Sequence, residues 1–542
     1  MRRRGTAACG AGLLLAALVA QPLLSVAPAS AGSGVTFTVD TTAGRTPISP
    51  LIYGINSSAA DAGFTADLAA TRPTTVRLGG NRWTAYNWLT NNSNAGNDYC
   101  FQNDDYLSSS TSPGAAVLPT VTQDQQAGVT TMVTVPIVDH LAGDRNGGTC
   151  DLNDERNSSA NVMNSPDYVN TRMVTNNAVD PAGVGGAPNP ASKQVYQDHF
   201  LAWLRQSAPS ARLMVGLDNE PDDWRCTHPE AWPPPGFPSS GGCTNPFNSS
   251  QAVQTGALQG YAAFTDRELT YARAVKAVAP DAVVAGPSLA TYAGILQLQG
   301  GPDSSSSFLD YYLGRVHAAN AADGKALVDD FDVHWYSQVA GVGSTDTSAS
   351  VVDAREQAPR SLWDPGYVEN SWITSGPTNG AAIRLLPWLQ EHIASGNPGM
   401  RIAMSEWDYG AGGHISGAIA DADVLGILGR YGVHTASHWP LSPDQSFVKG
   451  AFKVFRNYDG RGASFGDTEV SATTSDPATT SVYASTQAAD ASRLVLVAIN
   501  KAATPTTATI RLTGFSAGQA AVYTLTGASP DPQPAAGLTL IR

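Results

Sequence analysis

The sequence has an excess of acidic residues, few cysteines and almost no long apolar runs, and each of these limits what the protein can be. Its 32 Lys and Arg residues face 46 Asp and Glu residues, for a formal net charge of -14. Nucleic acid and anionic membrane surfaces are bound through clustered cations that displace counterions, so we expect neither partner. The nine histidines are scattered, and no HExxH pair, GxxxxGKS/T phosphate loop or GxGxxG fingerprint is present. Metal catalysis is therefore disfavoured.

The one long apolar run lies at the start of the chain. Arg2–Arg4 is cationic, Leu13–Val19 is apolar, and Ala29–Ala31 offers small residues at a cleavage site. This pattern predicts a secretory signal peptide over residues 1–31 and an extracellular protein that begins near residue 32. A membrane anchor is disfavoured, because Gln21-Pro22 interrupts the run before it reaches spanning length.

Only five cysteines occur, and Cys9 lies in the predicted signal. The remaining four, Cys100, Cys150, Cys226 and Cys243, form an even set in an oxidising compartment, which suggests two disulfides. Of the three possible pairings we favour the local one, Cys100 with Cys150 and Cys226 with Cys243. A zinc site is the weaker alternative, because the sequence has no CxxC-type pair.

In the rest of the chain, the pattern of apolar and helical stretches changes at two points. In residues 49–447, short buried runs alternate with helical stretches, as in an α/β fold with parallel strands. Eight runs predict a TIM-like (β/α)8 barrel with long loops, and they are Leu51–Ile55, Thr75–Leu78, Thr130–Ile137, Leu213–Leu217, Ala282–Gly286, Phe331–Trp335, Arg401–Ser405 and Thr435–Trp439. Residues 448–542 hold short β-rich runs between turn residues and predict an all-β sandwich, completed by a strand in residues 32–48.

Two glutamates follow buried strands in the same way. Glu220 lies in the stretch Asp218–Pro221 after one predicted strand, and Glu406 directly follows Arg401–Ser405. In β/α barrels the carboxyl ends of the strands carry the active site. Hydrolysis of a glycosidic bond needs two carboxyl groups, one to protonate the leaving oxygen and one to attack or to activate water. The pair predicts a glycoside hydrolase, although a lone glutamate at a strand end often only caps a helix or pairs with an arginine.

Two residues near the glutamates suit the same chemistry. Asn219 directly precedes Glu220 and is expected to bind a sugar hydroxyl, since a hydrogen bond to the 2-OH that tightens in the transition state helps glycosidases. Arg77 closes the second predicted strand and is expected to keep Glu406 ionised, because a nearby cation lowers a carboxyl pKa. The alternative for Arg77 is a structural ion pair with an aspartate such as Asp139 or Asp218.

Several other polar and aromatic residues lie at strand ends or on loops. His334 and Tyr336 end the sixth predicted strand and are expected to orient the two carboxylates, unless they only fill space at the rim. Trp439 ends the eighth strand and is expected to stack under a sugar ring, with a core position as the alternative. Trp224 lies on an aromatic loop and is either a second sugar platform or an anchor for that loop.

A series of long motifs, in order from about Ile48 to Leu512, resembles glycoside hydrolase family 44, which contains secreted bacterial β-glucanases and xyloglucanases of the retaining type. The motifs are residues 50–56, 77–81, 86–88, 218–221, 332–336, 360–365, 414–432 and 455–460. The resemblance implies Glu220 as general acid/base, Glu406 as nucleophile and an endo mode on β-1,4-linked glucan. Asn81, in the second motif, is assigned to substrate binding.

The resemblance also carries expectations about cofactors and about local departures. No cofactor is needed for the chemistry, and structural calcium or zinc is allowed without assigned ligands. Trp407 and Asp408 stand where the family usually has Tyr-Asn, which is expected to alter the near subsite or the pH optimum. The sandwich ends early, so its last strand is expected to be short. A hydrolase of xylan or mannan and a non-catalytic carbohydrate-binding protein stay open as alternatives, and we expect a monomer.

Overall fold

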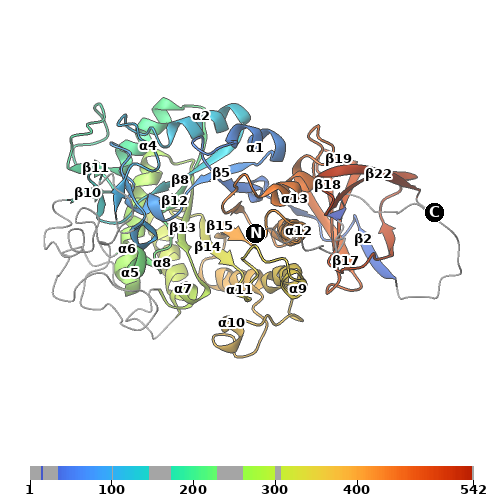
Figure 1. Cartoon of the computed structure of the whole chain (residues 1–542). Helices are drawn as coiled ribbons and strands as arrows, with labels where there is room; N and C mark the ends of the chain where they lie inside the picture. The colour runs from blue at the N-terminus through green and yellow to red at the C-terminus, as the bar shows by residue number, and fades with distance from the viewer. Residues whose placement is uncertain are drawn as a thin grey trace, which may run out of the picture.

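The computed structural model shows a β/α barrel beside a β-sandwich (Figure 1), and it describes residues 14–15, 34–99, 102–145, 172–228, 260–298 and 307–539. Eight strands, all paired in parallel, close into the barrel in the order β12-β13-β14-β15-β16-β4-β5-β8. Their bounds are β4 Gly54–Asn56, β5 Thr75–Leu78, β8 Thr130–Val135, β12 Arg212–Leu217, β13 Val283–Leu289, β14 Asp330–Tyr336, β15 Arg401–Asp408 and β16 Thr435–His438. The predicted barrel is confirmed.

A helix follows each barrel strand and covers the outside of the barrel (Figure 1). These helices are α1 Phe64–Thr71, α2 Leu118–Ala127, α4 Gln197–Ser207, α6 Gly260–Val278, α8 Phe308–Asp323, α11 Leu385–Gly396, α12 Ile415–Arg430 and α13 Ser446–Arg456. The predicted domain boundary at residue 448 falls inside α13, which is the eighth helix of the barrel. Among the described residues, no helix combines the length and the hydrophobicity that a membrane span requires.

Shorter elements occupy the loops of the barrel. The helical ones are η1 Pro50–Ile52, η2 Asn81–Ala85, η3 Gly96–Tyr99, α5 Trp224–Thr227, α7 Tyr292–Leu296, α9 Ala349–Gln357, η7 Ala358–Leu362 and α10 Trp372–Ser375. The extended ones are β6 Ser93–Asn94, β7 Asn103–Asp104, β9 His140–Ala142, β10 Met173–Asn177 and β11 Gln194–Tyr196.

The first barrel strand is shorter than predicted. The residues before Gly54 form the 3-10 turn η1 instead of extended chain, with Ser49 Oγ accepting a hydrogen bond of 3.2 Å from the backbone N–H of Leu51. Pro50 stands at the first position of the turn, where its missing N–H is not needed and its fixed φ suits a helical start. The apolar run predicted a strand here, but its first residues form a capped turn that starts with proline instead.

The sandwich strands are β2 Val35–Asp40, β17 Thr468–Thr474, β18 Thr480–Gln487, β19 Asp490–Asn500, β20 Ala508–Thr513, β21 Gln519–Thr526 and β22 Ser529–Thr539. The strand β2 lies between β17 and β20, and the two-residue strand β3 Thr46–Pro47 pairs with β17. The two-residue strand β1 Leu14–Leu15 pairs with β19 and β21, although it belongs to the predicted signal peptide. The expectation of a short last strand is wrong, since β22 has 11 residues and pairs along β21.

Helices α12 and α13 lie between the barrel and the sandwich (Figure 1). Asp423 of α12 accepts a hydrogen bond of 2.6 Å from the hydroxyl of Tyr483 in β18. Arg430, at the end of α12, lies 4.5 Å above the same ring and donates to the carbonyl of Val482 at 2.6 Å. At Gly426 an added Cβ would come within 2.3 Å of the Tyr483 ring, so the close approach requires glycine. These contacts hold the sandwich against the seventh strand–helix unit, which carries Glu406.

Candidate active site

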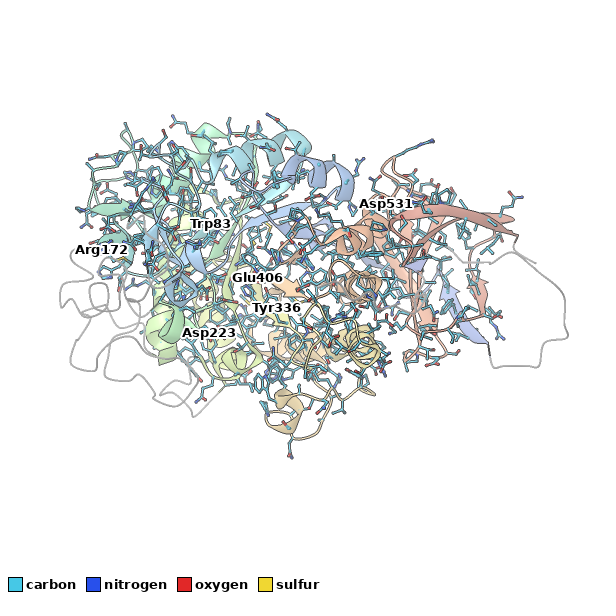
Figure 2. The ribbon with its side chains drawn as sticks, viewed as in Figure 1. Trp83, Arg172, Asp223, Tyr336, Glu406 and Asp531 are labelled. Carbon is cyan, nitrogen blue, oxygen red and sulfur yellow. The ribbon has the colours of Figure 1, made fainter. Side chains whose placement is uncertain are left out.

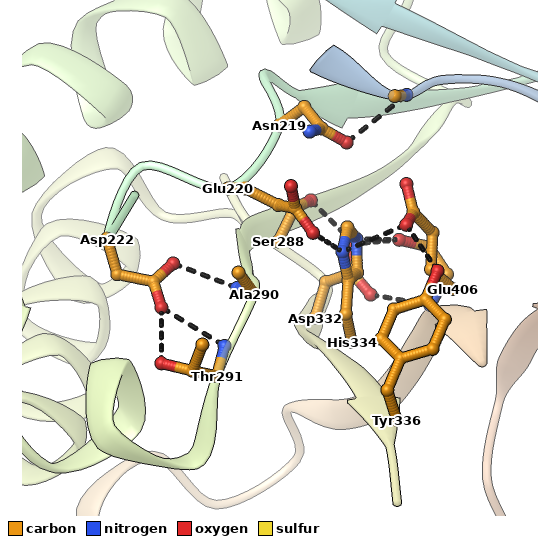
Figure 3. Close-up of polar contacts among 12 residues, drawn as sticks. Asn219, Glu220, Asp222, Ser288, Ala290, Thr291, Asp332, His334, Tyr336 and Glu406 are labelled. Carbon is orange, nitrogen blue, oxygen red and sulfur yellow. Dashed lines mark hydrogen bonds and ion pairs between the residues drawn. The ribbon is translucent and has the colours of Figure 1, made fainter. Parts of the chain in front are cut away.

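The carboxyl ends of three barrel strands bring these predicted site residues together. Glu220 follows β12, His334 and Tyr336 lie on β14, and Glu406 lies on β15 (Figures 2 and 3). One oxygen of each glutamate and a ring nitrogen of His334 all lie within 4.8 Å of one another. His334 Nδ1 is 2.9 Å from Glu220 Oε1 and 3.4 Å from Glu406 Oε2. A single imidazole therefore lies between the two carboxyl groups.

The turn after β12 presents Glu220 in an unusual backbone conformation. Asp218 and Glu220 have φ values of 66° and 51°, a region that residues other than glycine rarely adopt. The buried Asp218 carboxylate holds the turn by accepting hydrogen bonds from the backbone N–H groups of Ile137 at 2.6 Å and Asn219 at 2.8 Å. The N–H of Glu220 donates to the carbonyl of Ser288 at 2.9 Å. Strain of this kind persists where surrounding contacts enforce it, as they do here.

Glu406 is buried and surrounded by donors. Arg77 Nη1 lies 2.6 Å from its Oε1, and the Tyr336 hydroxyl donates to its Oε2 at 2.8 Å. Burial raises the pKa of Glu406, but the charge on His334, the Arg77 guanidinium and the Tyr336 hydrogen bond outweigh it and hold the pKa below its usual value. Glu406 is thus prepared as a carboxylate.

Arg77 is fixed by three partners. It donates to Glu406, to Asn56 Oδ1 at 3.1 Å and to Asn219 Oδ1 at 2.8 Å. Its alternative partner Asp139 instead forms an ion pair with Arg267. Asn219 receives a further bond from the N–H of Gly80 at 3.2 Å, which fixes its amide with Nδ2 turned to the other side. Among the described residues, that buried Nδ2 has no hydrogen-bond partner. Because buried donors are usually paired, an N–H group without a partner among the described residues suits a hydrogen bond to a bound ligand.

A bulge in β15 brings two successive side chains to His334. Between β14 and β15, Asp332 pairs with Ala403 but His334 pairs with Glu406, so β15 holds one extra residue. Such a bulge re-aims side chains that would otherwise alternate between the faces of the sheet. Ser405 and Glu406 consequently both reach the imidazole, Ser405 Oγ lying 3.1 Å from Nε2.

Behind His334, a buried network fixes the imidazole. The Asp332 carboxylate accepts the hydroxyls of Ser405 at 2.7 Å and Ser288 at 2.6 Å, and the N–H of Ser405 at 2.9 Å. Because the Ser405 hydroxyl proton points to Asp332, its oxygen is free to accept from His334 Nε2–H. This leaves Nδ1 as the nitrogen that exchanges a proton on the side of the glutamates. Burial lowers the pKa of His334, yet the charge on Glu406 and the hydrogen bond with Glu220 raise it above its usual value.

A cleft of about 940 Å³ opens beside this centre. Its lining includes Arg77, Gly80, Asn81, Tyr106 and Trp439, so it runs from the partner of Glu406 out over the loop after β5. Trp439 is half-buried and lies against Gly80, where an added Cβ would meet the indole at 2.4 Å. Trp439 therefore lies on the cleft side, and its role as a sugar platform stays a prediction.

Comparisons with known proteins indicate the family of the chain. Residues 92–339 match the family model for glycoside hydrolase family 44. Endoglucanase A of Paenibacillus lautus is 34% identical over 539 residues, covering 93% of this chain and 70% of that protein. The β-mannanase/endoglucanase A of Caldicellulosiruptor saccharolyticus is 34% identical over 507 residues, covering 86% of this chain and 34% of that protein. A Paenibacillus polymyxa xyloglucanase structure from family 44 superimposes with a TM-score of 0.80 at 32% identity, over 94% of this chain and 95% of that one.

The chain belongs to glycoside hydrolase family 44. The resemblance drawn from the motifs is confirmed, and so is the prediction that the protein is a glycoside hydrolase.

Two tryptophans of this family 44 chain do not face the cleft. Trp224 is wholly buried, with Nε1 donating to the carbonyl of Asn219 at 2.9 Å and its ring 6.1 Å from that of Phe264. Its assignment as a substrate-binding residue is wrong, because a ring enclosed by protein cannot stack on a sugar; it anchors the turn that carries Glu220. Trp407 is equally buried and stacks on Phe452 of α13 at 6.5 Å, so it does not form the near subsite.

Asn81 lines the cleft but is engaged within the protein. Its Nδ2 donates to the carbonyl of Ala95 at 2.6 Å and to Asp98 Oδ2 at 2.7 Å. Its Oδ1 lies 2.5 Å from His228 Nε2. These bonds show that Asn81 ties together the loops around the cleft. Contact between Asn81 and the substrate stays a prediction.

Asp408, Asp421 and His438 form a second cluster behind the active site. His438 Nε2 lies 3.2 Å from Asp408 and 3.1 Å from Asp421. Burial lowers the pKa of His438, but the two carboxylates raise it to about 10. Burial raises the pKa of Asp421 to about 6. A protonated imidazole between two carboxylates is one state of this cluster. The three residues also each offer one ligand atom within 4.8 Å of the others, so the same groups could hold a cation. The calcium or zinc allowed by the resemblance stays a prediction.

The disulfide predictions fall outside the described residues. Cys100, Cys150 and Cys243 are not described, and Cys226 is described only as part of the backbone of α5. Both pairings stay predictions.

Proposed function

We propose that this enzyme cleaves β-1,4-linked glucan chains, cellulose-type or xyloglucan, at internal bonds with retention of anomeric configuration. Glu406 is the nucleophile and Glu220 the general acid/base. The observation that most supports this is the closeness of the two carboxyl groups around His334, within 4.8 Å between their nearest described atoms. Retaining enzymes place the pair about 5 to 5.5 Å apart, whereas inverting enzymes leave about 6.5 to 9.5 Å for a water molecule.

The reaction then proceeds in two displacements. In the first, the Glu406 carboxylate attacks the anomeric carbon and forms a glycosyl ester, while Glu220 gives its proton to the departing oxygen. In the second, Glu220 takes a proton from water, which attacks the same carbon and releases Glu406. Arg77 and Tyr336 keep Glu406 ionised before the attack. His334 lies 2.9 Å from Glu220 and supports the proton transfers at that side.

Two further residues support binding of a sugar at the reaction centre. The unpartnered, buried Nδ2 of Asn219 suits the 2-OH of the sugar that is attacked, whose hydrogen bonds strengthen in the transition state. Trp439 offers an indole face beside Arg77 and Gly80. Apolar sugar faces stack on such rings, which orients the sugar without adding charge.

The two residue roles are tested by azide rescue. Glu220→Ala should keep activity on substrates with good leaving groups and, with azide added, should yield a β-glycosyl azide, because the ester on Glu406 still forms. Glu406→Ala should yield only the α-azide, since azide replaces the nucleophile directly. The same azide anomer from both variants, or rescue of neither, would contradict the assignment.

A substrate panel tests the proposed specificity and the two open alternatives. We expect reducing ends to be released from xyloglucan and carboxymethyl cellulose faster than from xylan or mannan. Mannan is included because the name of the Caldicellulosiruptor saccharolyticus relative contains both mannanase and endoglucanase. Preference for xylan or mannan would replace the glucan assignment, and release from no polysaccharide would favour a carbohydrate-binding role.

We also propose that the protein is secreted as a monomer after removal of residues 1–31. N-terminal sequencing of protein from the culture medium should begin near Gly32. A retained start, or a species larger than one chain in light scattering, would overturn the corresponding part.

A further inference from the structure

The cleft lies on one side of the catalytic pair. Its described lining comes from the ends and following loops of β4, β5 and β16, and it includes Arg77, the partner of Glu406. Glu220, after β12, is on the opposite side of His334 (Figure 3). In a double displacement, the sugar chain that stays bound is attached to the nucleophile, and the leaving group departs past the acid. Because the cleft lies away from the acid, past which the leaving group departs, it suits the retained part of the substrate, its glycone.

An exposed aromatic ring lines this cleft and packs against an arginine that the protein holds in place. Tyr106 is 75% exposed, although its ring belongs to the cleft lining. The guanidinium of Arg82 lies 4.2 Å from its ring centroid. Arg82 is in turn held by an ion pair with Asp104, which is only 7% exposed. The position of the ring is thus set by the protein before any ligand arrives.

Asp104 connects the support to the loop that carries the ring. Its Oδ1 accepts the hydroxyl of Ser93 at 2.6 Å and the backbone N–H of Tyr106 at 3.2 Å. The same carboxylate therefore orients both the cation beneath the ring and the backbone of the ring residue. Burying a tyrosine ring stabilises a folded protein, but this ring is left largely in solvent. An exposed aromatic ring that is nevertheless held in a fixed position indicates a binding surface.

The charges in the cleft indicate the class of ligand. Asp61, Asp98, Asp104 and Asp105 belong to the lining, against the guanidinium groups of Arg77 and Arg82. Both arginines are already paired, with Glu406 and with Asp104. Asp105 is also paired with Arg145 at 3.2 Å, which leaves Asp61 and Asp98 as the surplus. The surplus of carboxylates disfavours anionic chains such as those with uronic acid units, and many hydroxyl-binding oxygens suit a neutral sugar.

We propose that Tyr106, supported by Arg82 and Asp104, is a sugar-stacking platform for a distant unit of a neutral glucan glycone. This inference rests on the proposed function and adds to it a specificity-determining residue away from the reacting bond. A short glycone that fills only the end near Arg77 and Trp439 does not reach the platform. A longer one gains the contact, so activity rises with glycone length.

The test uses aryl β-cello-oligosaccharides with glycones of two to five glucosyl units, cleaved by wild type, Tyr106→Ala and Tyr106→Phe. In Tyr106→Ala we expect kcat/KM to match wild type for the shortest glycone and to fall about 3- to 10-fold once the glycone reaches the platform. Tyr106→Phe keeps the ring and should follow wild type at every length. Thermal unfolding of both variants checks that the fold is kept.

Three results would overturn the inference. They are an equal loss at every glycone length, no loss at any length, and the same loss in Tyr106→Phe as in Tyr106→Ala. If wild type cleaves none of the series, the platform for an unbranched glucan glycone fails, whereas the glucanase function fails only if xyloglucan and carboxymethyl cellulose also release no reducing ends. If wild type is active and Tyr106→Ala behaves like it throughout, only the platform is lost.

Discussion

Arg77 and Glu406 form an ion pair of 2.6 Å in which the two side chains are 1% and 5% exposed. Removing one member of a buried pair leaves the other charge uncompensated, which costs about 3 to 5 kcal/mol of stability. A variant of Arg77 would therefore lose stability as well as activity, and the two losses could not be separated. The Tyr336 hydroxyl contacts the other oxygen of Glu406 without carrying a charge, so it is the better place to perturb the nucleophile.

Tyr336→Phe should move the acidic limb of the kcat/KM pH profile to higher pH. The hydroxyl hydrogen bond is one of the causes that hold the pKa of Glu406 below its usual value, while burial raises it. Without that bond the pKa of Glu406 rises, and Glu406 becomes protonated at a pH where wild type is still active. Loss of a hydrogen bond to a charged group costs about 1.5 to 3 kcal/mol, which corresponds to roughly 10- to 150-fold in rate. An unmoved acidic limb would show that the bond does not control the charge of Glu406.

Ser405→Ala should lower the pH at which His334 loses its proton, which an NMR titration of the imidazole measures. The substitution removes the oxygen that accepts His334 Nε2–H at 3.1 Å, so the doubly protonated imidazole is stabilised less and its pKa falls. Ser288→Ala is the matched control, because it removes one hydrogen bond to Asp332 and keeps the contact between Ser405 and His334. An equal pKa of His334 in the two variants would mean that the network is only structural.

His438→Gln should change the alkaline stability of the protein. The pKa of His438 is raised to about 10 in the folded protein from an ordinary 6.5, so its stabilisation is fully present below about pH 6.5 and is lost as the pH rises through about 10. Wild type should exceed the variant by roughly a few kcal/mol near pH 6.5, with the gap closing towards pH 10. Denaturant unfolding across this range measures the gap, and a gap that is constant with pH would refute the charged state of His438.

The sequence was sufficient for the barrel because its signals are local. Buried runs followed by helical stretches located all eight strands, and Glu220, His334 and Glu406 could be placed at one edge from their positions after or within those runs. The eighth helix, α13, was attributed to the sandwich, because it follows the last strand after only a short loop and precedes the β-rich region directly.

The parts that the sequence did not predict depend on long-range pairing. Ser405 and Asp332 are 73 residues apart, and their contact depends on a bulge that is visible only in the register between β14 and β15. The alternation in Asp332-Val333-His334 was an available signal, since residues two apart share a face of a strand. Trp224 was misassigned because an aromatic residue on a loop carries no local sign of whether its ring turns towards protein or substrate.

The anomeric configuration of the first product distinguishes one displacement at the anomeric carbon from two. The proposed double displacement through Glu406 inverts the anomeric carbon twice, so the reducing sugar released from a β-linked glucan should first appear as the β-anomer. Proton NMR during the first minutes of hydrolysis by wild type, before mutarotation, resolves the two anomers. Initial accumulation of the β-anomer is the predicted result, and initial accumulation of the α-anomer would contradict the account.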